Sequence, residues 1–349
     1  MNIGIVTHSL ESNYGGILQN YALQQALMTL GHSPITINCH SRDIAKLLRY
    51  NLKNLIYLPF PNKRRPFRWN SYIHPKFESF ARNIRLTDYC TKISHRIIDQ
   101  YSLDAIIVGS DQVWRPKYVS NLKDMYLSFA RRKQIKRMAY AASFGTNQWE
   151  YGASLTEYCR NLVSKFDKVT VRESSGVELC RQYLNVDAKK VLDPTLLLTK
   201  DDYNKLIRTS KEKKKDYLLA YLLDSTESQI KIIERIANDR NLEVIVIGAH
   251  DEVTITVEQW LGLFRDASYV VTDSFHGTVF SIIYNHEFIV FANETRGIDR
   301  FESLLNTFGL QNRIWKGNQK ILGEEVDWVV LDRILLRERI KSMQFLMQL

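Results

Sequence analysis

The sequence predicts an α/β protein made of two Rossmann-like domains with mainly parallel sheets. Short runs rich in Val, Ile and Ala alternate with helical patterns, and these runs lack the polar–apolar alternation of half-exposed strands. Strands buried on both faces are typical of parallel sheets that are covered by helices. The pattern restarts after residues 191–198, and 349 residues are too many for one ordinary core. Both observations favour two domains.

The first domain is expected over residues 1–195. A helix is predicted after Gly16, where the chain leaves its first strand through a turn of two glycines, and Gly31 ends it. Its apolar face consists of Leu18, Ala22, Leu23, Ala26, Leu27 and Leu30, at three- and four-residue spacing. The strands expected in this domain lie at 2–6, 35–39, 104–110, 137–145 and 168–173.

The second domain is expected over residues 196–324, and the tail 325–349 is predicted to form one or two helices that pack back on the first domain. Asp201 and Asp202 resemble a metal pair but are better interpreted as the N-terminal cap of a helix. The strands predicted here lie at 217–223, 242–248, 268–274 and 287–291, with helices at about 225–240, 259–264 and 276–285.

The composition gives a net charge of +10, from 48 basic and 38 acidic residues. Such a surplus attracts anions, unless it is only diffuse surface lysine. The four cysteines show no metal-ligand spacing, which favours a reduced compartment without structural zinc. No run of about 18 apolar residues and no signal peptide is visible. We therefore expect a cytoplasmic protein.

Residues 42–100 combine basic and aromatic side chains, with three prolines near residues 59–66 that interrupt regular structure. This composition suits peripheral contact with an anionic membrane, at the inner face of the plasma membrane, or with a lipid-linked substrate. The alternative is a mobile surface loop whose aromatic residues attach it to the fold.

Candidate site residues follow the carboxyl ends of the predicted strands, where open α/β sheets bind their ligands. His8, Glu173, Thr272 and Asp273 are polar residues at these ends. Facing strand ends would form a cleft with arginines for anionic oxygens, and with His276 and Asp111 for proton transfer. The predicted site comprises Asn13, Tyr14, Gly15, Gly16, Gln19, Ser110, Asp111, Ser143, Arg172, Ser274, His276, Gly277, Arg296 and Arg300.

Several of these residues have a purely structural alternative. The alternatives are Asp111 as a cap, Arg172 and Glu173 as a local ion pair that opens a helix, His276 as a capping residue, and Gln19 and Asn20 as surface amides. The sequence has no GxGxxG, GxxxxGK[ST], GxSxG or HExxH motif, so dinucleotide, P-loop, serine-hydrolase and zinc-protease chemistry lack their signatures. Nothing beyond charge indicates nucleic acid.

Six blocks in order resemble the polysaccharide pyruvyl transferase family. They are NYGGILQNYALQQALMTLGH, DAIIVGSDQVW, AYAASFG, TVRESSGVELC, VLDPTLLL and VTDSFHGTVFSIIYNHEFIVF, and the matching region extends from residue 2 to about residue 310. No single block is specific, so the resemblance depends on their order and rough spacing.

The resemblance implies a glycosyltransferase-B-like pair of domains with the active site between them. It implies transfer of pyruvyl from phosphoenolpyruvate to two hydroxyls of a sugar, which forms a ketal and releases phosphate. Such proteins act in the assembly of bacterial surface polysaccharide, including capsules, often on polyprenyl-diphosphate-linked glycans. No cofactor or metal is needed, because phosphoenolpyruvate is itself the donor.

The family's second-domain signature is commonly Ser-x-Arg-x-His. Here Thr272 stands at the serine position, Ser274 at the arginine position and His276 at the histidine position, so the arginine is missing. Arg296 or Arg300 is expected to supply that charge. The family's first-domain arginine matches Arg172.

On this basis we predict His276 as general acid or phosphate contact and Arg172 as anion clamp. Asp111 is predicted as base or acceptor-hydroxyl ligand, and Asn13 with Gly15 and Gly16 would bind the acceptor. The alternatives are a nucleotide-sugar glycosyltransferase of similar architecture, a non-catalytic glycan- or phosphate-binding protein, and a membrane-associated scaffold.

Overall fold

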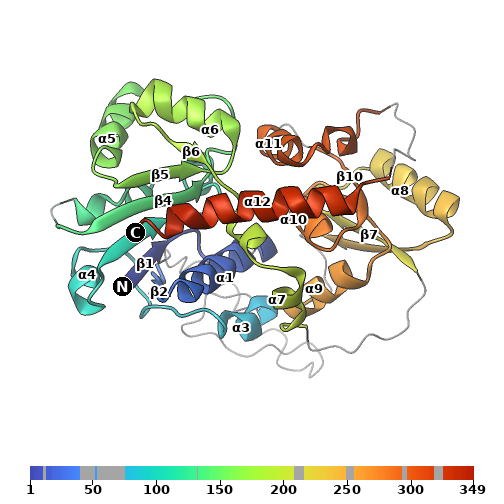
Figure 1. Ribbon diagram of the computed structural model, residues 1–349, viewed down its shortest axis with the longest axis horizontal. Helices are drawn as coiled ribbons and strands as arrows, with labels where there is room; N and C mark the ends of the chain where they lie inside the picture. The colour runs from blue at the N-terminus through green and yellow to red at the C-terminus, as the bar shows by residue number, and fades with distance from the viewer. Residues whose placement is uncertain are drawn as a thin grey trace.

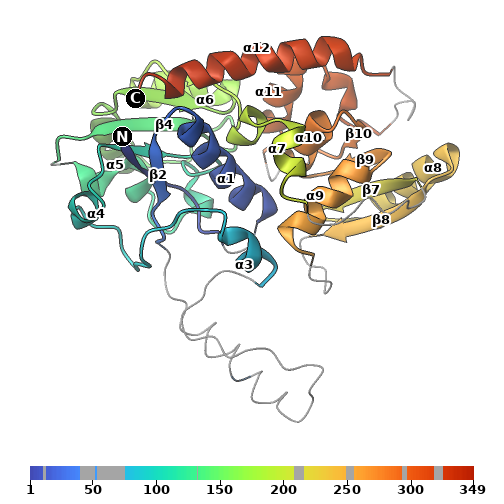
Figure 2. The ribbon, with the colours of Figure 1, turned by 60° about the horizontal axis from the view of Figure 1, so that its bottom comes forward.

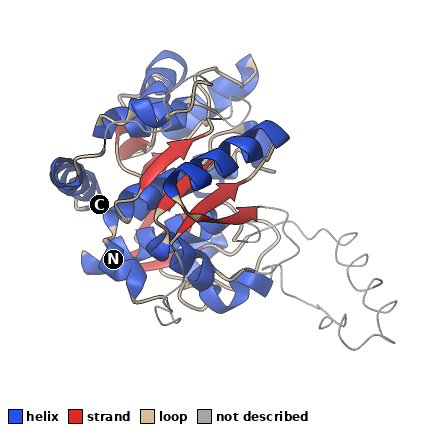
Figure 3. Ribbon diagram, turned by 90° about the vertical axis from the view of Figure 1, so that its right-hand side faces the viewer, coloured by secondary structure: helices blue, strands red, loops and turns tan. Residues whose placement is uncertain are grey.

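Two parallel sheets dominate the computed structural model, which confirms the predicted α/β fold class. Helices lie on both sides of the strands (Figure 3). The structure describes residues 1–10, 13–39, 52, 75–131, 133–207, 216–248, 255–292, 297–317 and 325–349.

The first sheet has the strand order β2-β1-β3-β4-β5-β6, and each neighbouring pair is parallel. The second strand begins earlier than predicted, because Ser33 and Pro34 pair with β1, whereas Cys39 makes only an isolated bridge to Cys90. The strands are β1 Asn2–Val6, β2 Ser33–Thr36, β3 Ala105–Val108, β4 Lys136–Ala142, β5 Lys168–Val171 and β6 Lys189–Lys190.

The second sheet has the order β10-β9-β7-β8, again with parallel neighbours. All four of its strands match the predicted positions. They are β7 Tyr217–Leu222, β8 Glu243–Gly248, β9 Tyr269–Thr272 and β10 Glu287–Val290.

Helices connect the strands and cover the sheets. Thr199 caps α7 through a reciprocal hydrogen-bonded capping box with Asp202, so the two aspartates at 201 and 202 belong to a helix start, as predicted. The helices are α1 Tyr14–Thr29, α3 Pro75–Ala81, α4 Arg96–Gln100, α5 Ala153–Val163, α6 Ser174–Leu179, α7 Lys200–Asn204, α8 Glu227–Arg240, α9 Val257–Asp266, α10 Phe275–Ile283, α11 Asp299–Phe308 and α12 Trp328–Leu346.

The two sheets lie side by side, and a continuous apolar core joins the units around them (Figure 1). Tyr14, at the start of α1, stacks on Trp260 of α9 with ring centroids 5.5 Å apart. Its hydroxyl donates a hydrogen bond of 2.6 Å to the Ile255 carbonyl. The predicted binding residue Tyr14 is therefore part of the contact between the units.

The C-terminal tail forms one long helix, α12, which lies across both units (Figure 2). Ser342 Oγ accepts a hydrogen bond from the Leu192 amide, and Arg339 donates to the carbonyls of Leu196 and Leu198. Leu346 is fully buried in a cluster with residues of β1, α1 and β3. The tail thus packs against the first sheet and the segment that follows β6.

Residues 42–51 and 53–74, which carry most of the predicted basic and aromatic segment, lie outside the described residues. In the part of the chain that the structure describes, no helix is long and apolar enough to cross a membrane.

Leu346→Ala is expected to lower the free energy of unfolding by about 2–4 kcal/mol, because it leaves a cavity in the cluster that attaches α12 to the first sheet. Urea unfolding followed by circular dichroism measures the loss. Leu336 of the same helix is 54% exposed, so Leu336→Ala is the matched control and should change little. Equal effects of the two substitutions would contradict this packing.

Candidate active site

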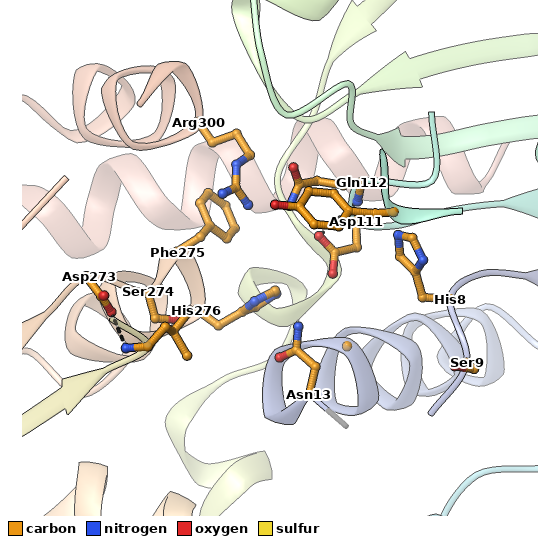
Figure 4. A pocket seen from close by; sticks show the side chains of 13 residues that line it. His8, Ser9, Asn13, Asp111, Gln112, Asp273, Ser274, Phe275, His276 and Arg300 are labelled. Carbon is orange, nitrogen blue, oxygen red and sulfur yellow. Dashed lines mark hydrogen bonds between the residues drawn. The ribbon is translucent and has the colours of Figure 1, made fainter. Parts of the chain in front are cut away.

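A cavity of about 280 Å³ lies where the carboxyl ends of both sheets meet. Open α/β sheets bind ligands at this edge of their strands. The first unit contributes the residues that follow β1 and β3, and the second unit those that follow β7 and β9 (Figure 4). The cavity is lined by His8, Ser9, Asn13, Gly16, Asp111, Gln112, Tyr118, Leu223, Asp273, Ser274, Phe275, His276 and Arg300.

The start of α1 forms one wall. Asn13 caps the helix by accepting a hydrogen bond of 2.9 Å from the Gly15 amide. The sequence predicted a glycine turn before the helix, but Gly15 and Gly16 lie inside its first turn. A Cβ on Gly15 would overlap the imidazole of His276, so glycine permits a close approach of the two units.

The start of α10 forms the facing wall. Ser274, not His276, caps this helix, because its side chain accepts a hydrogen bond of 3.4 Å from the Gly277 amide. Gly277 has no room for a side chain beside Thr272. His276 Nε2 lies 3.8 Å from Asp193 Oδ2, a separation typical of an ion pair rather than a hydrogen bond.

Arg172 lies beneath the cavity wall and joins two carboxylates. Its Nη2 is 3.0 Å from Asp111 Oδ1, and its Nη1 is 2.9 Å from Asp193 Oδ2. The guanidinium also lies over the Phe275 ring, 4.2 Å from the centroid. The proposed local pair of Arg172 with Glu173 is therefore wrong, since the Glu173 carboxylate accepts from the amides of residues 144 and 145 instead.

These contacts determine the charges under the cavity. Burial alone would raise the pKa of the Asp111 carboxyl, but nearby positive charge, chiefly that of the Arg172 guanidinium, outweighs burial and holds that pKa below its usual range. Burial acts in the same way on Asp193, where His276 and then Arg172 overcome it and lower the pKa. Both carboxylates therefore stay ionised at neutral pH.

Three predicted binding residues take part in buried hydrogen bonds within the protein. Gln19 Oε1 accepts from the Ser110 amide at 3.0 Å, and its Nε2 donates to Thr7 Oγ1 at 3.0 Å. Ser110 Oγ donates to the Ala141 carbonyl at 2.9 Å, and Ser143 Oγ accepts from the Gly145 amide at 3.0 Å. Gln19 and Asn20 are fully buried, so the surface-amide alternative is wrong.

Arg300, at the start of α11, brings a buried guanidinium to the cavity. Burial, together with the nearby charge of Arg172, lowers its pKa to about 10. This value leaves Arg300 protonated at neutral pH. Arg296 lies outside the described residues.

The sequence analysis did not single out the lining residues Ser9, Tyr118, Leu223 and Phe275, and it also missed Asp193 beneath the cavity. Asp193 follows β6 and accepts hydrogen bonds from Ser110 Oγ at 3.2 Å and Thr195 Oγ1 at 2.7 Å, besides the contact with Arg172. The Asp-Pro pair after a strand was its only signal. His8 and Asp273 were collected at strand ends without a role, and both line the cavity.

The described residues contain no group of three or more His, Cys, Asp or Glu side chains that is arranged to hold a metal ion. Asp273, the acidic residue of the second unit that lines the cavity, accepts hydrogen bonds from the amides of Leu223 and Asp224 at 2.6 and 2.8 Å.

Solved structures of similar fold are glycosyltransferase-B proteins and epimerases. A UDP-GlcNAc 2-epimerase from Neisseria meningitidis, bound to UDP-GlcNAc, superposes with a TM-score of 0.50 at 8% identity, covering 99% of this chain and 94% of that chain. An epimerase of the same description from Rickettsia bellii gives 0.43 at 10%, covering 99% and 97%. The Streptomyces glycosyltransferase SsfS6 gives 0.41 at 11%, covering 100% and 95%.

The fold is therefore that of the glycosyltransferase-B class, with its cavity between two Rossmann-like units. The family model named Polysaccharide pyruvyl transferase matches residues 13–295, so the chain belongs to the polysaccharide pyruvyl transferase family and is a transferase. Among curated proteins, none is significantly similar to this chain.

Asp193→Asn is expected to cost about 3–5 kcal/mol of unfolding free energy at neutral pH, because it removes one of two carboxylates that neutralise a buried guanidinium. Urea unfolding measures the loss. The control is Asp99→Asn, which breaks a surface pair with Lys133 and should cost no more than about 1 kcal/mol.

The stability of the wild type and that of Asp193→Asn are expected to depend differently on pH. The pKa of Asp193 is depressed in the folded state, so its stabilisation is complete above the unfolded value of about 3.9 and is lost as pH falls below it. The gap in stability between wild type and Asp193→Asn should narrow below about pH 4. A gap that is constant down to pH 2 would contradict the ion-pair role.

Proposed function

We propose that this protein transfers pyruvyl from phosphoenolpyruvate to two hydroxyls of one sugar, forming a ketal and releasing phosphate. The acceptor would be a glycan for bacterial surface polysaccharide, carried on a polyprenyl diphosphate. Family membership supports the reaction class. The observation that carries the proposal is a cavity lined by the buried guanidinium of Arg300, by His276 at the start of α10 and by the first turn of α1.

The cavity suits a small anion that carries both a carboxylate and a phosphate. The first turns of α1 and α10 line it, with Asn13, Gly16, Ser274 and His276. Helix N-termini offer amide groups and the positive end of the helix dipole to anions. Arg300 adds a full positive charge, since its pKa of about 10 keeps it protonated.

The reaction requires proton transfer as well as anion binding. C3 of the enolpyruvyl group gains a proton while C2 becomes open to attack by a hydroxyl, so a general acid must reach C3. Positive charge near the carboxylate and phosphate stabilises the charge that develops. We assign the acid to His276, whose imidazolium would have the Asp193 carboxylate as partner at 3.8 Å.

We change the predicted role of Arg172 and keep one of the two roles predicted for Asp111. Both terminal nitrogens of Arg172 contact carboxylates, so we assign the direct anion contact to Arg300 and let Arg172 position Asp111. Of the two predicted roles for Asp111, the low pKa favours the acceptor-hydroxyl ligand over the base, because a weakly basic carboxylate is a poor proton acceptor.

Arg300 also fits the charge that is missing from the family's Ser-x-Arg-x-His signature. Ser274 stands at the arginine position, and both Ser274 and Arg300 line the same cavity. We propose that the guanidinium comes from α11 in this chain instead of from the start of α10.

The first experiment measures phosphate release from phosphoenolpyruvate over galactosides, glucosides and N-acetylhexosaminides, both free and lipid-linked, with mass detection of the product. Acceptor-dependent phosphate and the mass gain of one pyruvyl ketal are expected. Tight binding of nucleotide sugars without phosphate release would favour glycosyl transfer instead. Binding of phosphoenolpyruvate or glycan without release would favour a non-catalytic role.

Arg300→Ala is expected to lower kcat/KM for phosphoenolpyruvate by about 10²–10³-fold, because it removes a charge aimed at the anion. Adding Ser274→Arg should restore part of the loss by returning the guanidinium to the family position. Arg337→Ala is the control, since the Arg337 side chain is 65% exposed on α12. Unchanged activity in Arg300→Ala would remove this arginine from the site.

A further inference from the structure

We infer that His8 is a catalytic residue, the general base that accepts the proton of the attacking acceptor hydroxyl, while His276 on the facing wall is the general acid. This inference rests on the proposed function and names a second proton-transfer group in the same cavity. His8 follows β1 in the first unit and His276 lies on α10 in the second, so each unit supplies one histidine.

The two imidazoles flank one space. Figure 4 shows His8 and His276 entering the cavity from opposite sides, with the Asp111 carboxylate between them. A substrate bound between two such rings has one proton-transfer group on each side. Addition of a hydroxyl to C2 and of a proton to C3 needs this arrangement, because the two events involve different atoms of the enolpyruvyl group.

Asp111, the other candidate for the group that contacts the acceptor hydroxyl, already has hydrogen-bond partners within the protein. Its Oδ1 accepts from Arg172 Nη2 at 3.0 Å and from the Gln112 amide at 2.9 Å. Its carboxylate remains ionised because its pKa is held below the usual range. Asp111 can orient a hydroxyl, but its proton affinity is too low for an efficient base at neutral pH.

His8 has the protonation state that a base needs. Burial lowers the pKa of its imidazole, and the opposing charge of Asp111 does not overcome burial, while Arg172 adds to the lowering. Asp111 and Arg172 are the charged groups that act on His8, together with the backbone of Gln112. The ring is therefore neutral near pH 7 and has a lone pair for a proton.

The two histidines balance the protons of the whole reaction. In the first step the acceptor oxygen bonds to C2, its proton passes to His8, and His276 gives a proton to C3. In the second step the C2–phosphate bond breaks, its electron pair leaves with the phosphate, and His8 returns a proton to it. The second hydroxyl then bonds to C2 and gives its proton to His276. Both residues end in their starting states, with ketal and phosphate as products.

The test is His8→Ala in the full chain, with phosphoenolpyruvate and the acceptor found for the wild type. We expect kcat to fall by about 10²–10⁴-fold while KM for phosphoenolpyruvate changes by less than about 3-fold. Free imidazole should restore part of kcat, with a pH dependence that follows the added base. His32→Ala is the matched control, because His32 lies at the far end of α1 beside β2.

Three outcomes overturn the assignment while leaving the proposed function intact. One is wild-type kcat in His8→Ala. Another is a loss of kcat that imidazole does not restore in a variant whose circular dichroism is unchanged. The third is a pH–kcat profile of the wild type that lacks the acidic limb expected when a base must be unprotonated.

An NMR titration of the His8 ring separates this inference from the reaction itself. In the free wild-type protein, the pKa of His8 should lie below the ordinary value of about 6.5. In Arg172→Gln the pKa of His8 should be higher than in the wild type, because the substitution removes a repelling positive charge. If the wild type releases no phosphate from phosphoenolpyruvate, the proposed function fails. In that case, a low pKa of His8 would still support its assignment as a base, for a different substrate with a hydroxyl group. A His8 ring that is protonated at pH 7 would overturn the assignment.

Discussion

The buried guanidinium of Arg172 is the constraint on which the rest of the site depends. It follows β5, and its two carboxylate partners follow β3 and β6, so one side chain holds three strand ends in a fixed relation. Burying these charges has a large desolvation cost, which close geometry and further hydrogen bonds must offset. Asp193 receives those bonds from Ser110 and Thr195, and Ser110 is held in turn by Gln19 of α1. The ion pairs therefore fix the relative positions of three strand ends beneath the cavity.

The second constraint is the distance between the units. Gly15 lets the first turn of α1 approach the ring of His276, and one residue earlier Tyr14 stacks on Trp260. The same helix start thus attaches the units through its aromatic residue and forms the cavity wall through its glycines. Because α12 also packs across both units, contacts outside the cavity help to fix how the two units lie around it. A side chain at residue 15 would displace the His276 ring.

The sequence predicted the fold class and all four strands of the second sheet, because buried parallel strands are continuous apolar runs that periodicity detects. It placed the second strand of the first sheet too late and put a turn where α1 begins, since edge pairing and glycine in a helix depend on tertiary contacts. The strand-end rule and the match to the family motifs placed Asn13, Asp111, His276 and Arg300 at the site, and all four line the cavity. Asp193 was missed because its role arises from residues distant in sequence. Gln19 and Asn20 had a surface-amide alternative in the sequence, and only the structure reveals that they are buried.

The electrostatics of the cavity follow from which charges are already neutralised. Asp111 and Asp193 share Arg172, and Asp273 is held by backbone amides, so the acidic groups face partners within the protein. Arg300 and the starts of α1 and α10 bring positive charge and helix-dipole ends to the cavity wall. Burial disfavours the charged form of both kinds of group: it prevails at the His8 ring and lowers its pKa, whereas nearby positive charge prevails at the carboxylates and keeps them ionised. An anion that enters the cavity therefore meets carboxylates that already have partners, and in our proposal the His8 ring accepts the proton of a hydroxyl. The proposed mechanism thus separates anion recognition from proton transfer within one small cavity, above the buried ion pairs of Arg172.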